Sequence, residues 1–394
     1  LSRGHDHLFK CGAMRQSLVA FLCVAAMISR AAAQQAPPAL FSEMDGIHFL
    51  EDGTALPIWG YGWTTDGYIT LPGPLLQYQE GDQVVLAFEN PSPESHTIHL
   101  HGLDVDQAND GVPSTSFYVA TGESTAYEFT ATHSGTYLYH CHVTTTLHLT
   151  MGMYGMVLVT RPDGTIFEGG PSVSEDVPLL FSDLEVATNM DPVGSFPFHD
   201  MRPDVFMVNG KAGTQLEDEV VWTSSDAPTA LRLGSAAYSR IRCHFPEALN
   251  AQLWMSDGRP IPLEALDSLD MYPGERFTVL IQPEEGYDGG FHAEFLHMVD
   301  DQSESVQWIS VRDDSLHPSS MANLEGVRAT WFPSPVSDFV QTNSDRKYTV
   351  WDPWGRIVFH GKAEANRLDV SAWPNGVYTT RTDGGKVSRF LVSH

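Results

Sequence analysis

Cysteine and basic residues are both scarce in this sequence. Of its four cysteines, Cys11 and Cys23 lie near the amino terminus, which leaves only Cys141 and Cys243. Two cysteines are too few for a disulfide framework, although a single Cys141–Cys243 bridge stays open as an alternative. There are 22 lysines and arginines against 50 aspartates and glutamates, a net charge of −28. This charge argues against nucleic acids and anionic membranes as partners.

Long apolar runs are confined to the first residues of the chain. Met14–Arg15 begins a basic stretch, residues 17–28 are mainly apolar, and Ala31–Ala33 offer small side chains for cleavage. This order is typical of a secretory signal peptide, so residues 1–33 are interpreted as upstream residues and a signal peptide. No later run reaches the length of a membrane span. We therefore expect an exported mature protein.

Stretches with helical periodicity are also scarce, and the only one expected is a short helix from Leu263 to Leu269. Instead, short apolar runs alternate with turn residues, as strands do in sandwiches and barrels. Four such runs are Val84–Phe88, Met156–Val159, Phe277–Ile281 and Gln307–Val311. They predict β domains over 41–161 and 177–312 and a small third β unit over 327–394. Linkers are expected near 162–176 and 313–326.

Histidines gather in two short segments of the first β region. Side chains alternate between the two faces of a strand. His96 shares a face with Ile98 and Leu100, and Cys141 shares one with Tyr137 and Tyr139. His96 and Cys141 are therefore expected to point into an apolar interior. Four histidines of opposite parity are expected to point outward, and we call them the quartet: His99, His101, His140 and His142.

The inward pair is followed by further soft ligands in the spacing Cys-x6-His-x4-Met. His148 and Met153 occupy these positions after Cys141. Two imidazoles, a thiolate and a weak axial thioether form a blue, or type 1, copper site. The sequence therefore predicts the set His96, Cys141, His148 and Met153, with Met151 and Met156 as other nearby sulfurs. The quartet could bind further copper or zinc, or be an empty vestige.

These segments resemble the cupredoxin domains of multicopper oxidases and, more distantly, copper nitrite reductases. The matching pieces are Ile98–Gly102, Asp110–Pro113, Gly135–His142 and Gly152–Gly155. In the family, a type 1 copper takes single electrons from a donor and passes them to a trinuclear copper cluster that reduces dioxygen. The resemblance implies that His99 is a type 2 ligand and that His101, His140 and His142 are type 3 ligands. This arrangement resembles two-domain laccases with the blue copper in domain one.

The second β region resembles a multicopper oxidase domain that binds no copper. Its matching pieces are Asn209–Lys211, Leu231–Leu233, Ser256–Pro260 and Tyr272–Phe277. Ala251–Ser256 contains no histidine, and His244, His292 and His297 are scattered. The chain therefore holds half of a trinuclear ligand set. The resemblance implies an all-β fold with two tandem cupredoxin-like Greek-key β-barrels or sandwiches and a small C-terminal immunoglobulin-like β-sandwich.

Residues 327–394 resemble the type A sorting domain of the type IX secretion system; a small immunoglobulin-like binding module is the alternative. The matching pieces are Phe332–Asp338, Val350–Arg356, Leu368–Tyr378 and Phe390–Val392. The resemblance implies export through the periplasm of a Gram-negative bacterium, contact with the type IX machinery, and a secreted or cell-surface location.

Three functions stay open. A copper oxidase would need a homo-oligomer, in which two quartets meet across a two-fold axis or a neighbour supplies His292 and His297. A blue-copper electron carrier is the second possibility, because the second β region lacks ligands. A nitrite reductase is the third, although His99 stands where those enzymes have an aspartate. Expected electron donors are a phenolic compound, a metal ion or a redox protein, with dioxygen as the acceptor.

Overall fold

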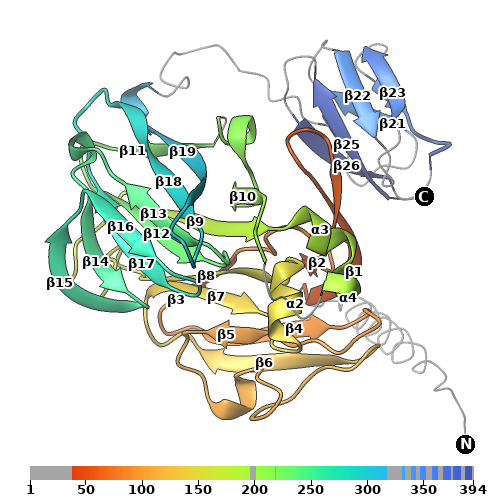
Figure 1. Cartoon of the computed structure of the whole chain (residues 1–394), viewed down its shortest axis with the longest axis horizontal. Helices are drawn as coiled ribbons and strands as arrows, with labels where there is room; N and C mark the ends of the chain where they lie inside the picture. Colours follow the sequence, from red (N-terminus) through yellow and green to blue (C-terminus); the bar gives the residue numbers. More distant parts are fainter. Residues whose placement is uncertain are drawn as a thin grey trace, which may run out of the picture. The chain divides into compact units, whose positions relative to one another are not determined.

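The computed structural model consists mainly of β-strands (Figure 1). It describes residues 38–195, 201–217 and 219–316, together with seven later segments: 331–332, 339–342, 347–351, 357–362, 367–373, 376–382 and 387–392. The predicted signal segment 1–33 and residues 317–326 of the second linker lie outside the described residues. Among the described helices, none is long and apolar enough to cross a membrane.

The first group of strands forms two four-stranded sheets, which we call the first sandwich. The sheet orders are β2-β1-β4-β6 and β3-β8-β7-β5. The strands are β1 Leu40–Phe49, β2 Ala55–Trp63, β3 Leu76–Gln79, β4 Gln83–Glu89, β5 His99–His101, β6 Ser124–Thr130, β7 Gly135–His140 and β8 Tyr154–Thr160. Two short helices join them, η1 (Gln107–Asn109) and α2 (Thr145–Thr150). The strands predicted at Val84–Phe88 and Met156–Val159 are confirmed.

Burial along β4 and β7 shows how the two sheets differ. In β4, Val84, Leu86 and Phe88 are buried while Val85 between them is exposed. This alternation belongs to a strand with one face on the core and one in water. In β7, all six residues are buried. The sheet that carries β7 is therefore covered on both of its faces.

A six-stranded and a five-stranded sheet form the second sandwich. Their orders are β10-β9-β12-β17-β14-β15 and β11-β19-β18-β13-β16. The strands are β9 Glu175–Leu184, β10 Val205–Val208, β11 Val220–Thr223, β12 Thr229–Ser235, β13 Arg240–His244, β14 Gln252–Ser256, β15 Arg259–Ala265, β16 Ser268–Met271, β17 Arg276–Ile281, β18 Asp288–Leu296 and β19 Ser303–Asp313. The short helices are α3 Val186–Met190, α4 Pro192–Ser195, η2 Gly213–Leu216, η3 Glu247–Leu249 and η4 Asp314–Leu316.

The strands predicted at Phe277–Ile281 and Gln307–Val311 are confirmed, but the helix predicted at Leu263–Leu269 is wrong. Those residues form the end of β15, a turn and the start of β16. Leu263 is exposed, whereas Leu269 is buried opposite Cys243. Cross-strand pairing of two short segments has overridden a helical spacing that covers less than two turns.

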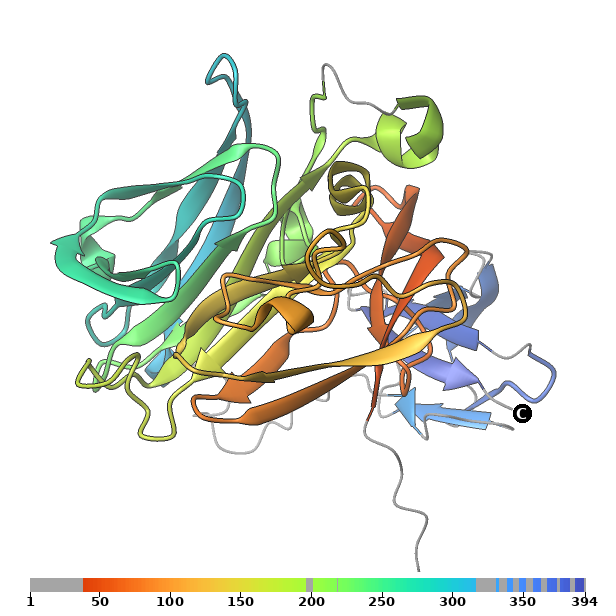
Figure 2. The same cartoon turned by 90° about the horizontal axis from the view of Figure 1, so that it is seen from below.

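A shared apolar cluster joins the two sandwiches. Each sandwich also has its own core, and the green-to-cyan strands of the second form a group separate from the red-to-yellow strands of the first (Figure 1, Figure 2). The shared cluster takes Leu138 and Met156 from β7 and β8, and Leu180, Leu184 and Met207 from the second sandwich. The second sandwich therefore covers the face of β7 that bears Leu138 and, by alternation, His140.

The C-terminal strands form a third, smaller pair of sheets, ordered β20-β21-β24 and β23-β22-β25-β26. Their bounds are β20 Trp331–Phe332, β21 Phe339–Thr342, β22 Lys347–Trp351, β23 Ile357–Lys362, β24 Arg367–Asp369, β25 Gly376–Thr382 and β26 Val387–Val392. A small core contains Tyr348, Val350, Leu368, Val370 and Tyr378. Residues 333–338, 352–356 and 374–375 of the expected sorting motifs lie outside the described residues. The all-β fold class is confirmed, and the proposed domain limits stay predictions.

Candidate metal centre

The buried set of predicted ligands converges at one end of the first sandwich. Cys141 follows β7 directly, His96 precedes β5, and His148 lies on α2. The Sγ of Cys141 is 3.1 Å from Nδ1 of His148 and 3.6 Å from Nδ1 of His96. All three side chains are fully buried. A thiol and two imidazole nitrogens thus surround a single point inside an apolar core, with their donor atoms within 4.8 Å of one another.

Backbone hydrogen bonds distinguish Met153 from the nearby Met151. The N–H of Cys141 donates to the carbonyl of Met153 at 3.1 Å, and the N–H of Met153 donates to the carbonyl of His148 at 2.9 Å. The carbonyl of Met151 instead accepts from Trp59. Both methionines are fully buried. The Met153 backbone is therefore tied to two of the predicted ligands, which favours Met153 as the axial thioether.

Helix α2 is the element that carries His148, and no sequence pattern indicates it. A single turn and a half is too short for a hydrophobic period to stand out. Thr144 precedes the helix with a left-handed backbone, φ 43°. The helix buries Leu147, His148 and Thr150. The segment after Cys141 is therefore a sharp bend followed by a helix that places His148 beside the thiol.

Burial sets the charge state of these groups in the metal-free protein. Desolvation lowers the pKa of His96 to about 3, and the neighbouring His148 adds to the shift. Burial likewise raises the pKa of the Cys141 thiol. Both imidazoles are thus neutral and able to act as ligands at ordinary pH, whereas the thiol must lose a proton when a metal binds. Nε2 of His96 and of His148 have no hydrogen-bond partner.

Two residues that the sequence reasoning missed lie against the His148 ring. Oε2 of Glu94 is 3.6 Å from Nε2 of His148, which is too long for a hydrogen bond. Glu94 is 55% exposed, whereas His148 is fully buried. The Trp59 ring meets His148 edge-on, with centroids 5.5 Å apart. Glu94 therefore offers a carboxylate between solvent and the buried imidazole.

The quartet lies on the opposite face of the same strands. His99 pairs directly with His140 across β5 and β7, and their rings are 5.1 Å apart. His101 Nδ1 is 3.3 Å from His140 Nε2. These three histidines have ligand nitrogens within 4.8 Å of one another. The His142 ring lies 5.2 Å from His99 and stacks on His140 at 5.9 Å, outside that closest set of three.

Hydrogen bonds at Nδ1 orient two of the quartet rings. Nδ1 of His99 lies 2.7 Å from the carbonyl oxygen of Asp110. The Asp110 loop can approach β5 because Gly111 has no Cβ, which would otherwise meet the Ile98 carbonyl. Nδ1 of His140 lies 3.0 Å from the Cys141 carbonyl. With Nδ1 donating in each ring, Nε2 remains available to a metal, as in many metal-binding histidines.

The expectation that the quartet points outward needs a correction. His140 is only 8% exposed, because the second sandwich covers this face of β7. Gly274 of the second sandwich approaches the His101 ring, and the Arg276 guanidinium occupies the space beside Gly102. Burial, followed by Arg276, lowers the pKa of His101 to about 4. The quartet thus borders the contact between the two sandwiches.

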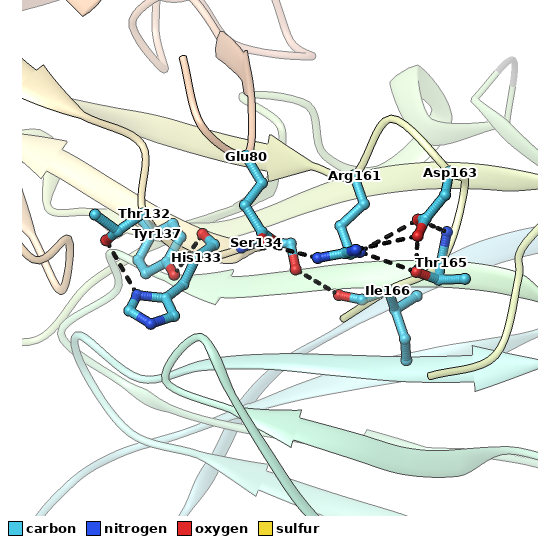
Figure 3. Close-up of polar contacts among 9 residues, drawn as sticks. All are labelled: Glu80, Thr132, His133, Ser134, Tyr137, Arg161, Asp163, Thr165 and Ile166. Atoms are coloured by element: carbon cyan, nitrogen blue, oxygen red, sulfur yellow. Dashed lines mark hydrogen bonds and ion pairs between the residues drawn. The ribbon is translucent and has the colours of Figure 1, made fainter. Parts of the chain in front are cut away.

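A polar network supports the start of β7, the strand that leads to Cys141 (Figure 3). Arg161 donates to Glu80 at 2.7 Å, and the Ser134 N–H donates to the same carboxylate at 3.2 Å. The Ser134 hydroxyl donates to the carbonyl of Ile166 at 2.9 Å. Tyr137, on β7 itself, donates to the carbonyl of His133 at 3.0 Å. These bonds tie β7 to the segment that leaves the first sandwich.

Histidines and cysteine of the second sandwich do not join either set. His244 and His292 pair with each other across β13 and β18. His297 is buried, and its Nδ1 lies 2.8 Å from Asp300. The expectation that His292 and His297 act together for a neighbour stays a prediction. Cys141 and Cys243 are both free. The alternative of a disulfide bridge between them is therefore wrong.

Comparison with known proteins finds a family whose model matches the segment with both donor sets. A family model described as multicopper oxidase matches residues 60–164, the part of the chain that holds both donor sets. Residues 60–164 thus resemble a multicopper oxidase domain.

Relatives of this domain include both copper oxidases and nitrite reductases. A copper-containing nitrite reductase from Neisseria gonorrhoeae is 27% identical over 44% of this chain and 43% of its own length. Laccase-2 from Cryptococcus neoformans is 25% identical over 56% of this chain and 40% of its own length. A solved blue copper oxidase from Nitrosomonas europaea shares the fold, with a TM-score of 0.59, 23% identity, and coverage of 70% of this chain and 85% of its own. The chain thus spans less than half of the two sequence relatives.

The donor atoms of the two sets fit copper. A buried thiol and neutral imidazoles are soft and borderline ligands, which suit copper in both of its common oxidation states. The quartet offers imidazole nitrogens only, which suit copper or zinc. Copper is the cofactor that this family and the buried donor set imply.

Proposed function

We propose that this chain is a copper-dependent oxidase that removes single electrons from a reducing donor and delivers them to dioxygen. Copper, when bound, supplies the one-electron redox chemistry. The observation that carries the proposal is the sequence His140-Cys141-His142. Cys141 belongs to the buried set and both of its neighbours belong to the quartet, so one peptide unit joins the two donor sets. This gives a short covalent path for an electron.

Electron entry is proposed at His148. Its ring is the part of the buried set that lies next to an exposed side chain, Glu94. Water is kept from the thiol because Cys141 and Met153 are fully buried. A carboxylate at the entry point favours a cationic donor, such as a reduced metal ion, over an anionic one. A phenolic compound or a redox protein remains possible as the donor.

Nitrite reduction is a second candidate. The closest set in the quartet contains three imidazoles, those of His99, His101 and His140. Three imidazoles suit a single metal ion rather than a cluster. A nitrite reductase is also among the relatives. A third possibility is an electron carrier that loads only the buried set.

We also propose that the oxidase is a homo-oligomer, exported by the type IX machinery of a Gram-negative bacterium to the cell surface or medium. One chain supplies four of the eight imidazoles of a trinuclear cluster. A two-fold contact between two quartets would supply eight. The other proposed source, His292 and His297 of a neighbour, is less favoured because His297 is buried in its own chain.

The test is a double variant, His99→Ala with His142→Ala, compared with His133→Ala. His133 is half exposed and outside both donor sets. The double variant should keep its blue colour and lose oxygen uptake with a reducing donor, whereas the His133 variant should keep both. Unchanged oxygen uptake in the double variant would refute the proposal. Nitrite consumption without oxygen uptake would favour the second candidate, and one copper per chain with neither activity would favour a carrier.

A further inference from the structure

A row of aromatic rings crosses the outer face of the five-stranded sheet in the second sandwich. His244 on β13 lies directly opposite His292 on β18, and His292 lies opposite Trp308 on β19. The ring centroids are 5.3 Å apart in the first pair and 5.9 Å apart in the second. Cys243 and Ala293 are fully buried. Alternation along the strands therefore turns both histidines away from the core.

A carboxylate completes this group. Oε2 of Glu294 is 3.3 Å from Nε2 of His244. Arg242 lies opposite Glu294 in the sheet, but its guanidinium is held by two bonds to Asp270, at 2.7 and 2.9 Å. A hydrogen bond from Ser303, and then His244, lower the pKa of the Glu294 carboxyl. Glu294 is therefore ionised and points its charge at the first imidazole.

Solvent reaches this group of side chains. His244 is 38% exposed and Glu294 is 23% exposed, and Trp308 is 48% exposed. Within the described part of the chain, the His292 imidazole makes ring contacts but no hydrogen bond. To bind a metal together with His244 and Glu294, the ring would turn one nitrogen towards them.

We propose that His244, His292 and Glu294 bind a divalent late transition metal ion, zinc(II) or copper(II). Two imidazoles and one carboxylate form a donor set common in zinc sites, and water can fill the remaining positions. Imidazole nitrogen also suits copper(II). Cross-strand pairing brings the two histidines together without any sequence motif, because they are 48 residues apart and opposite in the sheet. The Trp308 ring limits the movement of His292 on its other side.

This site is distinct from both donor sets of the first sandwich. His244 and His292 lie in the sheet β11-β19-β18-β13-β16, whereas the quartet lies on and beside β5 and β7 of the first sandwich. The proposal therefore does not depend on the oxidase activity. A metal here would be held by the second sandwich, the part of the chain expected to bind none.

Zinc binding tests the site. The full chain and the variant His244→Gln/His292→Gln are titrated with Zn²⁺ by equilibrium dialysis, with His133→Ala as a control for the loss of an exposed histidine. The full chain and the control should each bind one more zinc ion per chain than the double variant. Glu294→Gln should lower the affinity for that zinc ion at least roughly tenfold, because changes to residues that only support metal ligands already have an effect of that size. Equal zinc content in the full chain and the double variant would overturn the proposal.

A second measurement, the fluorescence of Trp308, does not depend on the total zinc content and distinguishes zinc from copper. Cu²⁺ bound next to Trp308 should quench its emission, and Trp308→Phe should remove that part of the quenching. Quenching by Cu²⁺ that zinc does not reverse would identify copper(II) as the preferred ion. If the double variant does not fold, the single variant His244→Gln replaces it. If a folded His244→Gln variant kept both the extra zinc ion and the quenching by Cu²⁺, the site would also be overturned.

Discussion

At the scale of single residues, alternation along two strands explains why the donors separate into two sets. His96 and Cys141 are fully buried, as their parity predicts. A strand with one face on a core allows one register only, since a shift by one residue would exchange the two faces. The inward positions of His96 and Cys141 were therefore predictable from sequence. Glu94 and Trp59 were not, because their contact with His148 joins segments with no pattern in common.

The axial sulfur gives the sharpest prediction at this scale. Met153→Leu should shift the visible absorption and the reduction potential of the copper-loaded protein, because the axial ligand tunes both. Met151→Leu is the matched control, since Met151 is equally buried and exchange of Met for Leu conserves volume. Spectra and redox titrations of both variants decide the matter. A shift in the Met151 variant alone would assign the axial position to Met151 instead.

At the scale of elements, prediction from sequence failed for helix α2 and for strands β15 and β16. Each of these elements has fewer than eight residues. A period cannot be identified over so few positions. The strand at Phe277–Ile281 in β17 is also short, but it was predicted correctly because an unbroken apolar run between turn residues indicates a buried strand without any period. An unbroken apolar run, rather than the length of the element, separated the two outcomes.

The bend before α2 carries strain that a substitution can remove. Thr144 is β-branched and has φ 43°, a conformation that costs about 1–2 kcal/mol for such residues. Asparagine tolerates it and also caps helices well. Thr144→Asn should therefore stabilise the fold by about 1 kcal/mol while keeping the blue colour. Thr146→Asn, inside the helix, should give no gain, and denaturant unfolding measures both. Equal effects would show that the bend is not strained.

A buried ion pair in the second sandwich tests a different element. Arg232 on β12 is 1% exposed and donates to Asp176 on β9 at 2.6 Å. Asp176→Ala should cost about 3 kcal/mol, because it leaves a buried cation without its partner. Asp288→Ala removes an exposed pair with Arg312 and should cost less than about 1 kcal/mol. Chemical denaturation compares the two. Arg232 also donates to the Thr278 hydroxyl at 3.0 Å. A cost for Asp176→Ala no larger than the control would mean that this bond alone satisfies Arg232.

At the scale of the whole molecule, the contact between the two sandwiches was the part that sequence could not supply. The quartet histidines were expected on a free surface because alternation describes one sheet at a time. Leu138 and Met156 on the same face pack against Leu180 and Met207. This packing joins residues far apart in sequence and covers the face that bears His140. Alternation alone therefore predicts the face on which a residue lies, but not whether another domain covers it.

Glycines at this contact provide a test of how closely the sandwiches must approach. Gly258 has φ +70°, and a Cβ there would lie 2.6 Å from the ring of Tyr137 on β7. Gly164 has φ +73°, but a Cβ there would meet nothing within 4 Å. The two positions therefore share a backbone conformation and differ only in the contact. Alanine should cost about 1 kcal/mol at Gly164, from the backbone alone.

At Gly258 the same change should cost about 2 kcal/mol more, because the added methyl group overpacks the contact. Thermal or denaturant unfolding measures both variants. Since Tyr137 lies on the strand that leads to His140 and Cys141, the Gly258 variant should also lose part of its second copper signal, while Gly164→Ala keeps it. Equal destabilisation by the two variants would mean that the sandwiches do not approach as closely as Gly258 requires. The cover over the quartet would then be open to solvent, and His101 and His140 would titrate at ordinary imidazole pKa values.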